Sequence, residues 1–169
     1  MILTKDELIT LHQNEIRILL HLASKVEPAM LDYRPSPKQR SLLELLQYLV
    51  IMGPVRFRTI LTDELNTESA RTAFQAEEAA AKAMGLAEIK DALGRQPAFL
   101  ADLLGSCSDG DLRTEIEMFG RKATRGAMLA ALVLSQHSAY RMQLFLYLKA
   151  CGREELNSAN LWGGRDYTA

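Results

Sequence analysis

Residues 135–149, SQHSAYRMQLFLYLK, decide how this chain folds. The segment has helical spacing, and the face at i, i+4, i+7 and i+11 is polar although we expect it to be buried. Its side chains are Gln136, Tyr140, Gln143 and Tyr147, flanked by Val133 and Leu144. Buried amide and phenol groups need hydrogen-bond partners, so this face should meet polar atoms or water, with Tyr48 as a candidate partner.

Two interpretations of this polar face stay open. Tyrosine rings can fill core volume while their hydroxyl groups reach the rim of the protein, which is the interpretation we favour. Alternatively, the face lines a pocket for a small molecule.

Capping signals predict two further helices. TKDE at residues 4–7 and SLLE at residues 41–44 are capping boxes followed by apolar residues at helical spacing. The first helix should end near Lys25, and the second should run toward Ile60. Gly53-Pro54 lies in the middle of the second helix, so we expect it to kink or divide that helix.

The remaining segments follow from composition and turn residues. Residues 62–84 are predicted to form a polar, alanine-rich surface excursion. A third core helix is predicted to start at Leu86, and Gly94 and Pro97 leave open whether it is continuous. Residues 107–111 predict a turn, and residues 112–119 a short extended segment.

The fourth core helix should run from about Thr124 to Cys151, with Gly152 as its stop. Residues 153–169 then form a tail that packs partly through Leu161 and Trp162. Four long helices with substantial connections predict an all-α four-helix bundle, a single domain over residues 1–169 with a small helical excursion between helices two and three.

Composition narrows the classes of function. The chain has 169 residues, 48% of them hydrophobic, which suits one domain with its own core. A net charge of −1 argues against nucleic-acid binding, and the longest apolar run, residues 127–134, is too short to span a membrane. Two widely spaced cysteines and the lack of a signal-peptide pattern predict a cytoplasmic protein with reduced thiols.

The three histidines do not predict a metal site by their spacing. His12 and His21 are nine residues apart on one helix, about half a turn out of phase, so they cannot converge on one ion. His137 is alone in its helix. A catalytic zinc normally has three protein ligands, and the chain shows no phosphate-binding loop or nucleophile motif either.

Two segments resemble the DinB (DNA-damage-inducible) superfamily of bacterial four-helix bundles. Residues 34–49, RPSPKQRSLLELLQYL, resemble its proline-rich lead followed by serine, an acidic residue and a ligand histidine. Residues 136–152 resemble a helix in which two histidines, four apart, precede Arg-Gly-Gln, a hydrophobic run with tyrosine, and a closing glycine. The residues that match this second frame are Arg141, Gln143, Tyr147, Leu148, Lys149 and Gly152.

The sequence differs from the family pattern at the positions of the metal ligands. The resemblance places Tyr48, Gln136 and Tyr140 at the three ligand positions, and Met142 replaces the glycine. His137 is one residue away from a ligand position, about 100° around the helix. We therefore expect a degenerate metal site and no cofactor, with nickel or zinc as the alternative.

The resemblance supports two hypotheses about function. In the first, the chain is a non-metal binding or interaction protein with a small-molecule ligand, and a homodimer like many relatives. In the second, it is an enzyme of the thiol-dependent transferase or isomerase type, metal-dependent or not, that uses the cavity around Tyr48 and Tyr140. The candidate pocket residues are Tyr48, Gln136, His137, Tyr140, Arg141 and Gln143.

Overall fold

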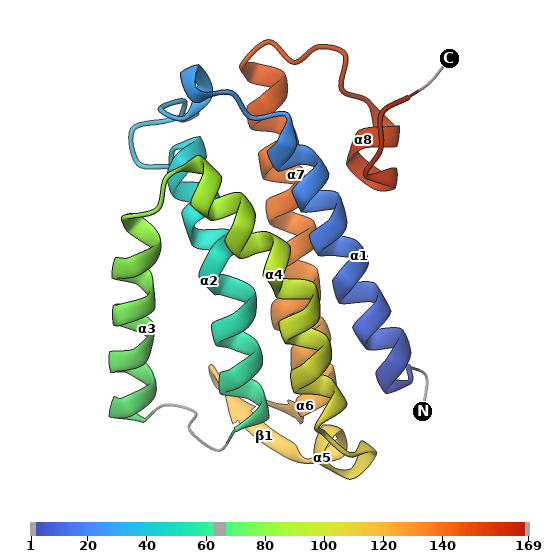
Figure 1. Cartoon of the computed structure of the whole chain (residues 1–169). Helices are drawn as coiled ribbons and strands as arrows, with labels where there is room; N and C mark the ends of the chain where they lie inside the picture. Colours follow the sequence, from blue (N-terminus) through green and yellow to red (C-terminus); the bar gives the residue numbers. More distant parts are fainter. Residues whose placement is uncertain (1–2, 63–66, 168–169) are drawn as a thin grey trace.

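Four long helices lie side by side in the computed structural model of the chain, which describes residues 3–62 and 67–167 (Figure 1). They are α1 (Lys5–Ser24), α2 (Leu42–Leu61), α4 (Leu86–Gly105) and a helix built from α6 (Arg125–Leu129), η2 (Ala130–Leu134) and α7 (Ser135–Ala150). The all-α fold class is confirmed. No helix in the described part of the chain is long and apolar enough to cross a membrane.

Both predicted capping boxes are present. The Thr4 hydroxyl accepts a hydrogen bond from the Glu7 N–H, and the Glu7 carboxylate accepts one from the Thr4 N–H. Ser41 and Glu44 make the same reciprocal pair at the start of α2. Each box satisfies N–H groups that the first turn of a helix leaves without a partner, which is why both helices begin where the sequence predicts.

Neither the second nor the third helix is divided at its proline, so of the two outcomes expected at Gly53-Pro54, division is wrong and a kink stays a prediction. α2 continues through Pro54, whose missing N–H leaves the Val50 carbonyl without its helical partner. The side chain of Gln96 on α4 supplies that partner, because its Nε2 donates to the Val50 oxygen at 2.8 Å and to the Leu49 oxygen at 3.0 Å. α4 is likewise continuous through Pro97.

The fourth helix contains a π-helical turn, η2, that the sequence did not predict. Leu129 is completely buried, and an uninterrupted α-helix from Leu129 would turn positions 136, 140, 143 and 147 toward the core. A π-turn inserts one residue and shifts every later position by one. The buried positions accordingly include His137, Arg141, Leu144 and Leu148, with Tyr147 buried beside them.

The predicted polar face is therefore wrong by one residue. Gln136, Tyr140 and Gln143 are half-buried, and Tyr147 alone of the four is buried. Gln136, Tyr140 and Gln143 lie at the edge of the helix's buried face. The residues one position further along the chain, His137, Arg141 and Leu144, occupy the core.

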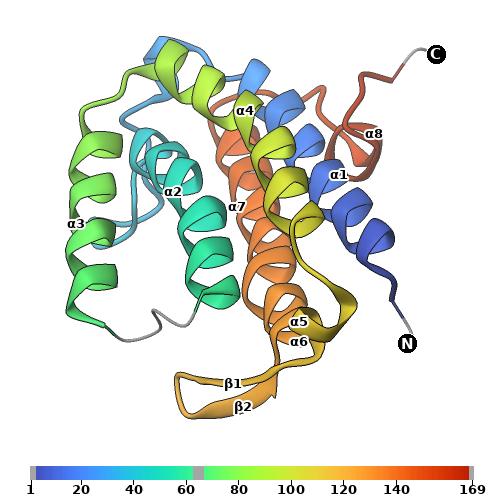
Figure 2. The ribbon, with the colours of Figure 1, turned by 60° about the horizontal axis from the view of Figure 1, so that its bottom comes forward.

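The peripheral elements partly match their predictions. α3 (Glu68–Lys82) begins after the cap Thr67 and packs against α2 at the outside of the bundle, with Ala81 as its one buried residue among those described, as expected for a surface excursion (Figure 2). Residues 63–66 of that excursion lie outside the described residues. The predicted turn at 107–111 is instead the start of a short helix, α5 (Asp109–Arg113), which Ser108 caps.

A β-hairpin closes one end of the bundle (Figure 2). β1 (Glu115–Met118), inside the predicted extended segment, pairs antiparallel with β2 (Arg121–Thr124), with Glu115 opposite Thr124. Phe119 and Gly120 form the two-residue turn, both with positive φ, as a tight hairpin turn requires. In the tail, α8 (Ser158–Gly163) buries Leu161 and leaves Trp162 60% exposed.

The apolar core is divided into two clusters along the bundle. One cluster contains Met52 on α2, Leu93 on α4 and Leu144 on α7, and the other contains Phe57, Leu100 and Val133 of the same three helices. Between them in sequence lie Gly53, Gln96, and His137 with Arg141. A polar layer therefore separates the two apolar clusters. The predicted pocket residues His137 and Arg141 lie in this layer.

Candidate functional site

Two of the predicted pocket residues meet at the edge of the bundle. The rings of Tyr48 on α2 and Tyr140 on α7 lie 5.3 Å apart, with an interplanar angle of 70°. The guanidinium carbon of Arg40, from the connection before α2, lies 4.1 Å from the centre of the Tyr48 ring. We call Arg40, Tyr48 and Tyr140 the tyrosine site.

The electrostatics of the tyrosine site favour the protonated form of the Tyr140 phenol. Burial raises the pKa of Tyr140, and the neighbouring Tyr48 raises it further by charge repulsion and hydrogen bonding, while Arg40 acts in the opposite direction. A phenol with a raised pKa donates hydrogen bonds and does not readily supply a phenolate.

A cleft of about 410 Å³ opens beside Tyr48, between the start of α2, the end of α3 and the connection before α2. Its charged lining residues are Asp32, Arg34, Arg40, Glu44, Glu78 and Lys82. Arg34 pairs with Glu44 at 3.4 Å and Lys82 with Glu78 at 3.3 Å, whereas no ion pair involves Arg40 within residues 3–62 and 67–167. Arg40 is thus a lining cation without a direct ion pair, although its charge helps to lower the pKa of Glu44 in the same cleft.

The other predicted pocket residues do not join the tyrosine site. Gln143 donates through Nε2 to the hydroxyl of Tyr147 at 2.7 Å, and that hydroxyl donates to the Arg40 carbonyl at 3.1 Å. These two side chains hold the connection before α2 against α7. Gln136 is half-buried on α7, and neither it nor Tyr140 lines the cleft.

Arg141 turns away from the cleft and toward α1. Its Nη1 donates to Glu15 Oε1 at 2.8 Å, with the side chains 5% and 13% exposed, and its guanidinium lies 4.8 Å from the Trp162 ring. A charged pair so far from solvent holds α7 to α1, and Trp162 of the tail covers it. The expectation that Arg141 lines the same pocket as Tyr48 is wrong, because the π-turn rotates it to the α1 side.

His137 lies on the α1 side too, where it meets His12. Both imidazoles are completely buried, and their ring centres are 6.1 Å apart at an interplanar angle of 80°. Burial lowers the pKa of His137 to about 4, and burial together with His137 lowers the pKa of His12 to about 3. We call His12, His137 and the nearby Gln96 the histidine cluster.

Sequence reasoning missed the histidine cluster because it compared His12 only with His21. The available signal was that Leu8 and Ile16, four residues to either side of His12, are core residues, so His12 had to share their face. That spacing predicts only that His12 is buried. The partner across the bundle depends on the π-turn.

The fold as a whole is similar to the crystal structure of a DinB-like protein (YjoA) from Bacillus subtilis. The match covers 89% of this chain and 95% of that chain, with a TM-score of 0.66 and 18% sequence identity. The chain has a DinB-like fold. At this identity the likeness shows the fold alone, and neither a protein-family model nor a curated protein matches the sequence.

In this DinB-like bundle, metal-ligating side chains are dispersed. Within the described ranges, no three side chains of His, Cys, Asp or Glu lie close enough together to hold a metal ion. Cys107 and Cys151, both half-buried, are free thiols. A metal centre with three such ligands is therefore not formed by the residues that the structure describes.

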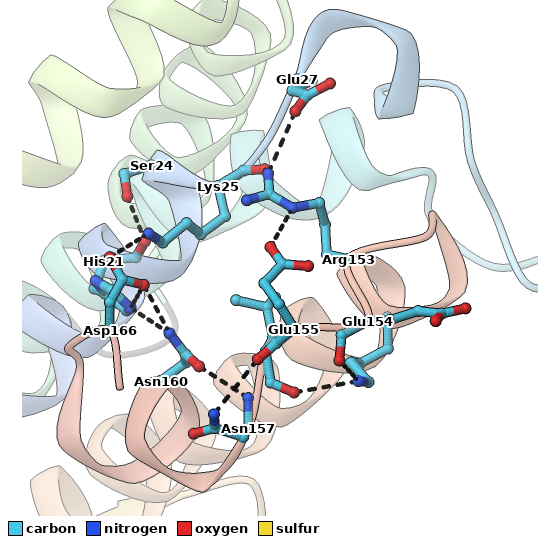
Figure 3. Close-up of polar contacts among 12 residues, drawn as sticks. His21, Ser24, Lys25, Glu27, Arg153, Glu154, Glu155, Asn157, Asn160 and Asp166 are labelled. Atoms are coloured by element: carbon cyan, nitrogen blue, oxygen red, sulfur yellow. Dashed lines mark hydrogen bonds and ion pairs between the residues drawn. The ribbon is translucent and has the colours of Figure 1, made fainter. Parts of the chain in front are cut away.

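The third histidine, His21, serves to hold the tail (Figure 3). Its Nε2 lies 3.1 Å from Asn160 Nδ2, and Asn160 Nδ2 also donates to Asp166 at 3.0 Å. Lys25 pairs with the same aspartate at 2.7 Å. Partial burial and Lys25 lower the pKa of His21, which keeps it neutral and able to accept from the amide.

Proposed function

We propose that this DinB-like chain is a binding protein that works without a metal ion and takes a small anionic molecule into the cleft beside Tyr48. The observation that carries the proposal is Arg40, a guanidinium stacked on Tyr48 at a cleft of about 410 Å³. A cation held by an aromatic ring leaves its N–H groups available for a carboxylate or phosphate.

The chemistry of the residues at the predicted ligand positions does not fit a divalent metal ion. Tyr48 and Tyr140 would have to ligate as phenolates, yet the pKa of Tyr140 is raised, so its proton is harder to remove. The positive charge of Arg40 over the Tyr48 ring adds repulsion against a bound cation. Only Gln136 would remain, and a single amide is a weak ligand.

The size and lining of the cleft indicate the class of ligand. Its volume lies within the range of about 300–1,000 Å³ that is usual for small-molecule sites. Arg40 would hold the anionic group, and Tyr48 offers a ring face and a hydroxyl donor. Arg34 and Lys82 are already paired with carboxylates, so a single anionic group suits the site better than several.

Calorimetric titration tests this proposal. The probes are glutathione, succinate and inorganic phosphate, added to the purified full chain at neutral pH. We expect saturable binding of at least one probe and a loss of tenfold or more in Arg40→Gln. The matched control is Arg95→Gln, an exposed arginine on α4 away from the cleft lining, which should bind as the wild type does. No binding of any probe, or equal binding in Arg40→Gln, contradicts the proposal.

An enzymatic role is the alternative. In it, the tyrosine site would act on a thiol-bearing substrate in a transferase or isomerase reaction, with Tyr140 donating a proton or hydrogen bond. The contacts that link Tyr140 to Tyr48 and Arg40 favour this alternative. Tyr140→Phe tests both roles: unchanged ligand affinity with lower stability would assign Tyr140 to packing alone.

We further propose a homodimer in the cytoplasm. Leu11 on α1 and Leu146 on α7 are 41% and 56% exposed, which supports an apolar contact between copies. Sedimentation should give twice the chain mass of 18.9 kDa, and a mass equal to one chain would refute the dimer.

A further inference from the structure

The histidine cluster contains buried polar atoms that the protein itself does not satisfy. His12 and His137 are completely buried and Gln96 is 3% exposed. Among the residues that the structure describes, both nitrogens of each imidazole and the Oε1 of Gln96 have no hydrogen-bond partner. A buried polar group left without a partner costs about 1–3 kcal/mol, so this cluster is an expensive feature of the core unless something else binds to it.

Three local features of the chain converge on this cluster. The π-turn η2 rotates His137 into the core, and π-turns occur frequently at functional sites. Gln96 is fixed by its two hydrogen bonds to α2, so its Oε1 has a defined direction. Gly53 leaves room beside both groups, because a Cβ there would lie 2.9 Å from His137 Nε2 and 3.5 Å from Gln96 Oε1.

The separation of the two imidazoles indicates which small species fits between them. With metal–nitrogen bonds of about 2 Å and ring centres about 1 Å behind the nitrogens, a linear N–metal–N unit places the rings roughly 6 Å apart, and a tetrahedral one roughly 5 Å apart. The observed separation is 6.1 Å. It is long enough for a linear two-coordinate unit, the geometry that a monovalent d¹⁰ ion prefers and zinc does not.

We propose that His12 and His137 bind one monovalent copper ion between them, with Gln96 Oε1 beside it. This site goes beyond the anion-binding function and shares no residue with the tyrosine site. Its two histidine ligands come from α1 and α7, and Gly53 of α2 and Gln96 of α4 lie beside His137.

The charges around the cluster agree with a monovalent ion. All three candidate ligands are uncharged as ligands, since a ligating imidazole is neutral and Gln96 is an amide. A divalent ion without an anionic ligand would be much more costly to bury than a monovalent one. Imidazole is an established ligand type for copper.

The test is anaerobic titration of the full chain with copper(I), kept reduced by ascorbate and measured by competition with bicinchoninate. We expect one ion per chain, with X-ray absorption showing nitrogen ligands and no sulfur. His12→Leu and His137→Leu should each weaken binding at least 100-fold. Both variants should fold, because apolar replacement of an unsatisfied buried group is close to neutral for stability.

Three further variants test whether copper binds at the histidine cluster and not at other histidine or cysteine side chains. Gly53→Ala retains both histidines but places a methyl group against His137, so it should weaken binding at least tenfold. His21→Gln and the double variant Cys107→Ser/Cys151→Ser should bind copper as the wild type does.

Several results would overturn the proposal. One is less than a tenth of an ion per chain, and another is equal affinity in the histidine variants. A crystal of copper-treated protein that shows only a water molecule between the two rings would have the same consequence.

Discussion

Two polar regions that include residues of α7 differ in how deeply their side chains are buried. Toward the start of α2, Tyr48 and Tyr140 are half-buried, meet edge to face and lie beside an arginine and a cleft. On the α1 side, His12 and His137 are completely buried, and within the described residues their nitrogens have no hydrogen-bond partner. The same helix thus contributes to a half-buried polar site beside the start of α2 and to a fully buried polar layer that includes α1.

This difference in burial predicts which substitutions change the free energy of unfolding most. A polar group near solvent can exchange a protein contact for water at little cost, whereas a buried one cannot. We therefore expect large effects from the polar layer and small ones from the tyrosine site.

The largest expected effect is acid destabilisation. The folded-state pKa values of His12 and His137 are about 3 and about 4, below the usual 6.5 of an unfolded chain. The unfolded state therefore takes up protons first, so stability is complete above pH 7 and is lost as the pH falls toward 4. Urea unfolding should show a loss of about 4 kcal/mol between pH 7.5 and pH 5. The double variant His12→Leu/His137→Leu should lose much less over the same interval, and an equal loss would contradict the assignment.

The next effect concerns the buried ion pair of Glu15 and Arg141. Arg141→Ala leaves the Glu15 carboxylate buried without its partner, and we expect a loss of about 3 kcal/mol in the free energy of unfolding. The double variant Glu15→Leu/Arg141→Leu should recover most of it, since no charge remains. A loss below 1 kcal/mol in the single variant would mean that water reaches the pair readily.

Gly53 and Gly94 form a matched comparison. Gly53→Ala places a methyl group 2.9 Å from His137 Nε2, so overpacking should cost about 2 kcal/mol. Gly94→Ala meets nothing within 4 Å on a helix, and should be neutral or stabilising by up to about 1 kcal/mol. Thermal unfolding of both variants checks this, and equal effects would show that the space beside Gly53 is not limiting.

Gln96→Leu removes the donor that satisfies the Val50 and Leu49 carbonyls, and should cost about 1.5 kcal/mol. Pro54→Ala restores a backbone N–H that can reach Val50. In that background the cost of Gln96→Leu should fall by about half in a double-mutant cycle. Additive costs would mean that Gln96 does not compensate for the proline.

The smallest effect is expected at the tyrosine site. Tyr140→Phe keeps the ring contact with Tyr48 and removes a half-buried hydroxyl, so stability should change by about 0.5 kcal/mol. Chemical denaturation measures this change. A loss above 2 kcal/mol would show that the tyrosine site is as dependent on its hydrogen bonds as the polar layer.

Much of the fold was predictable because its signals are local. The caps at Thr4 and Ser41, the stop at Gly152 and the alanine-rich composition of α3 each act within a few residues. The predicted contact of Tyr48 with Tyr140 also formed. The predicted pocket as a whole did not, because Arg141 and His137 face α1 and Gln143 holds Tyr147.

The amino-acid sequence by itself determined the helices, their caps and the all-α class, since hydrophobic period and capping chemistry are encoded within single segments. Only the tertiary structure decided which side of α7 faces the core and that α2 survives its proline. The first depends on a π-turn that adds one residue to the helical phase, and the second on a glutamine 42 residues further along the chain. The glutamine contact joins distant segments, and the hydrophobic and capping patterns of the sequence do not specify the π-turn.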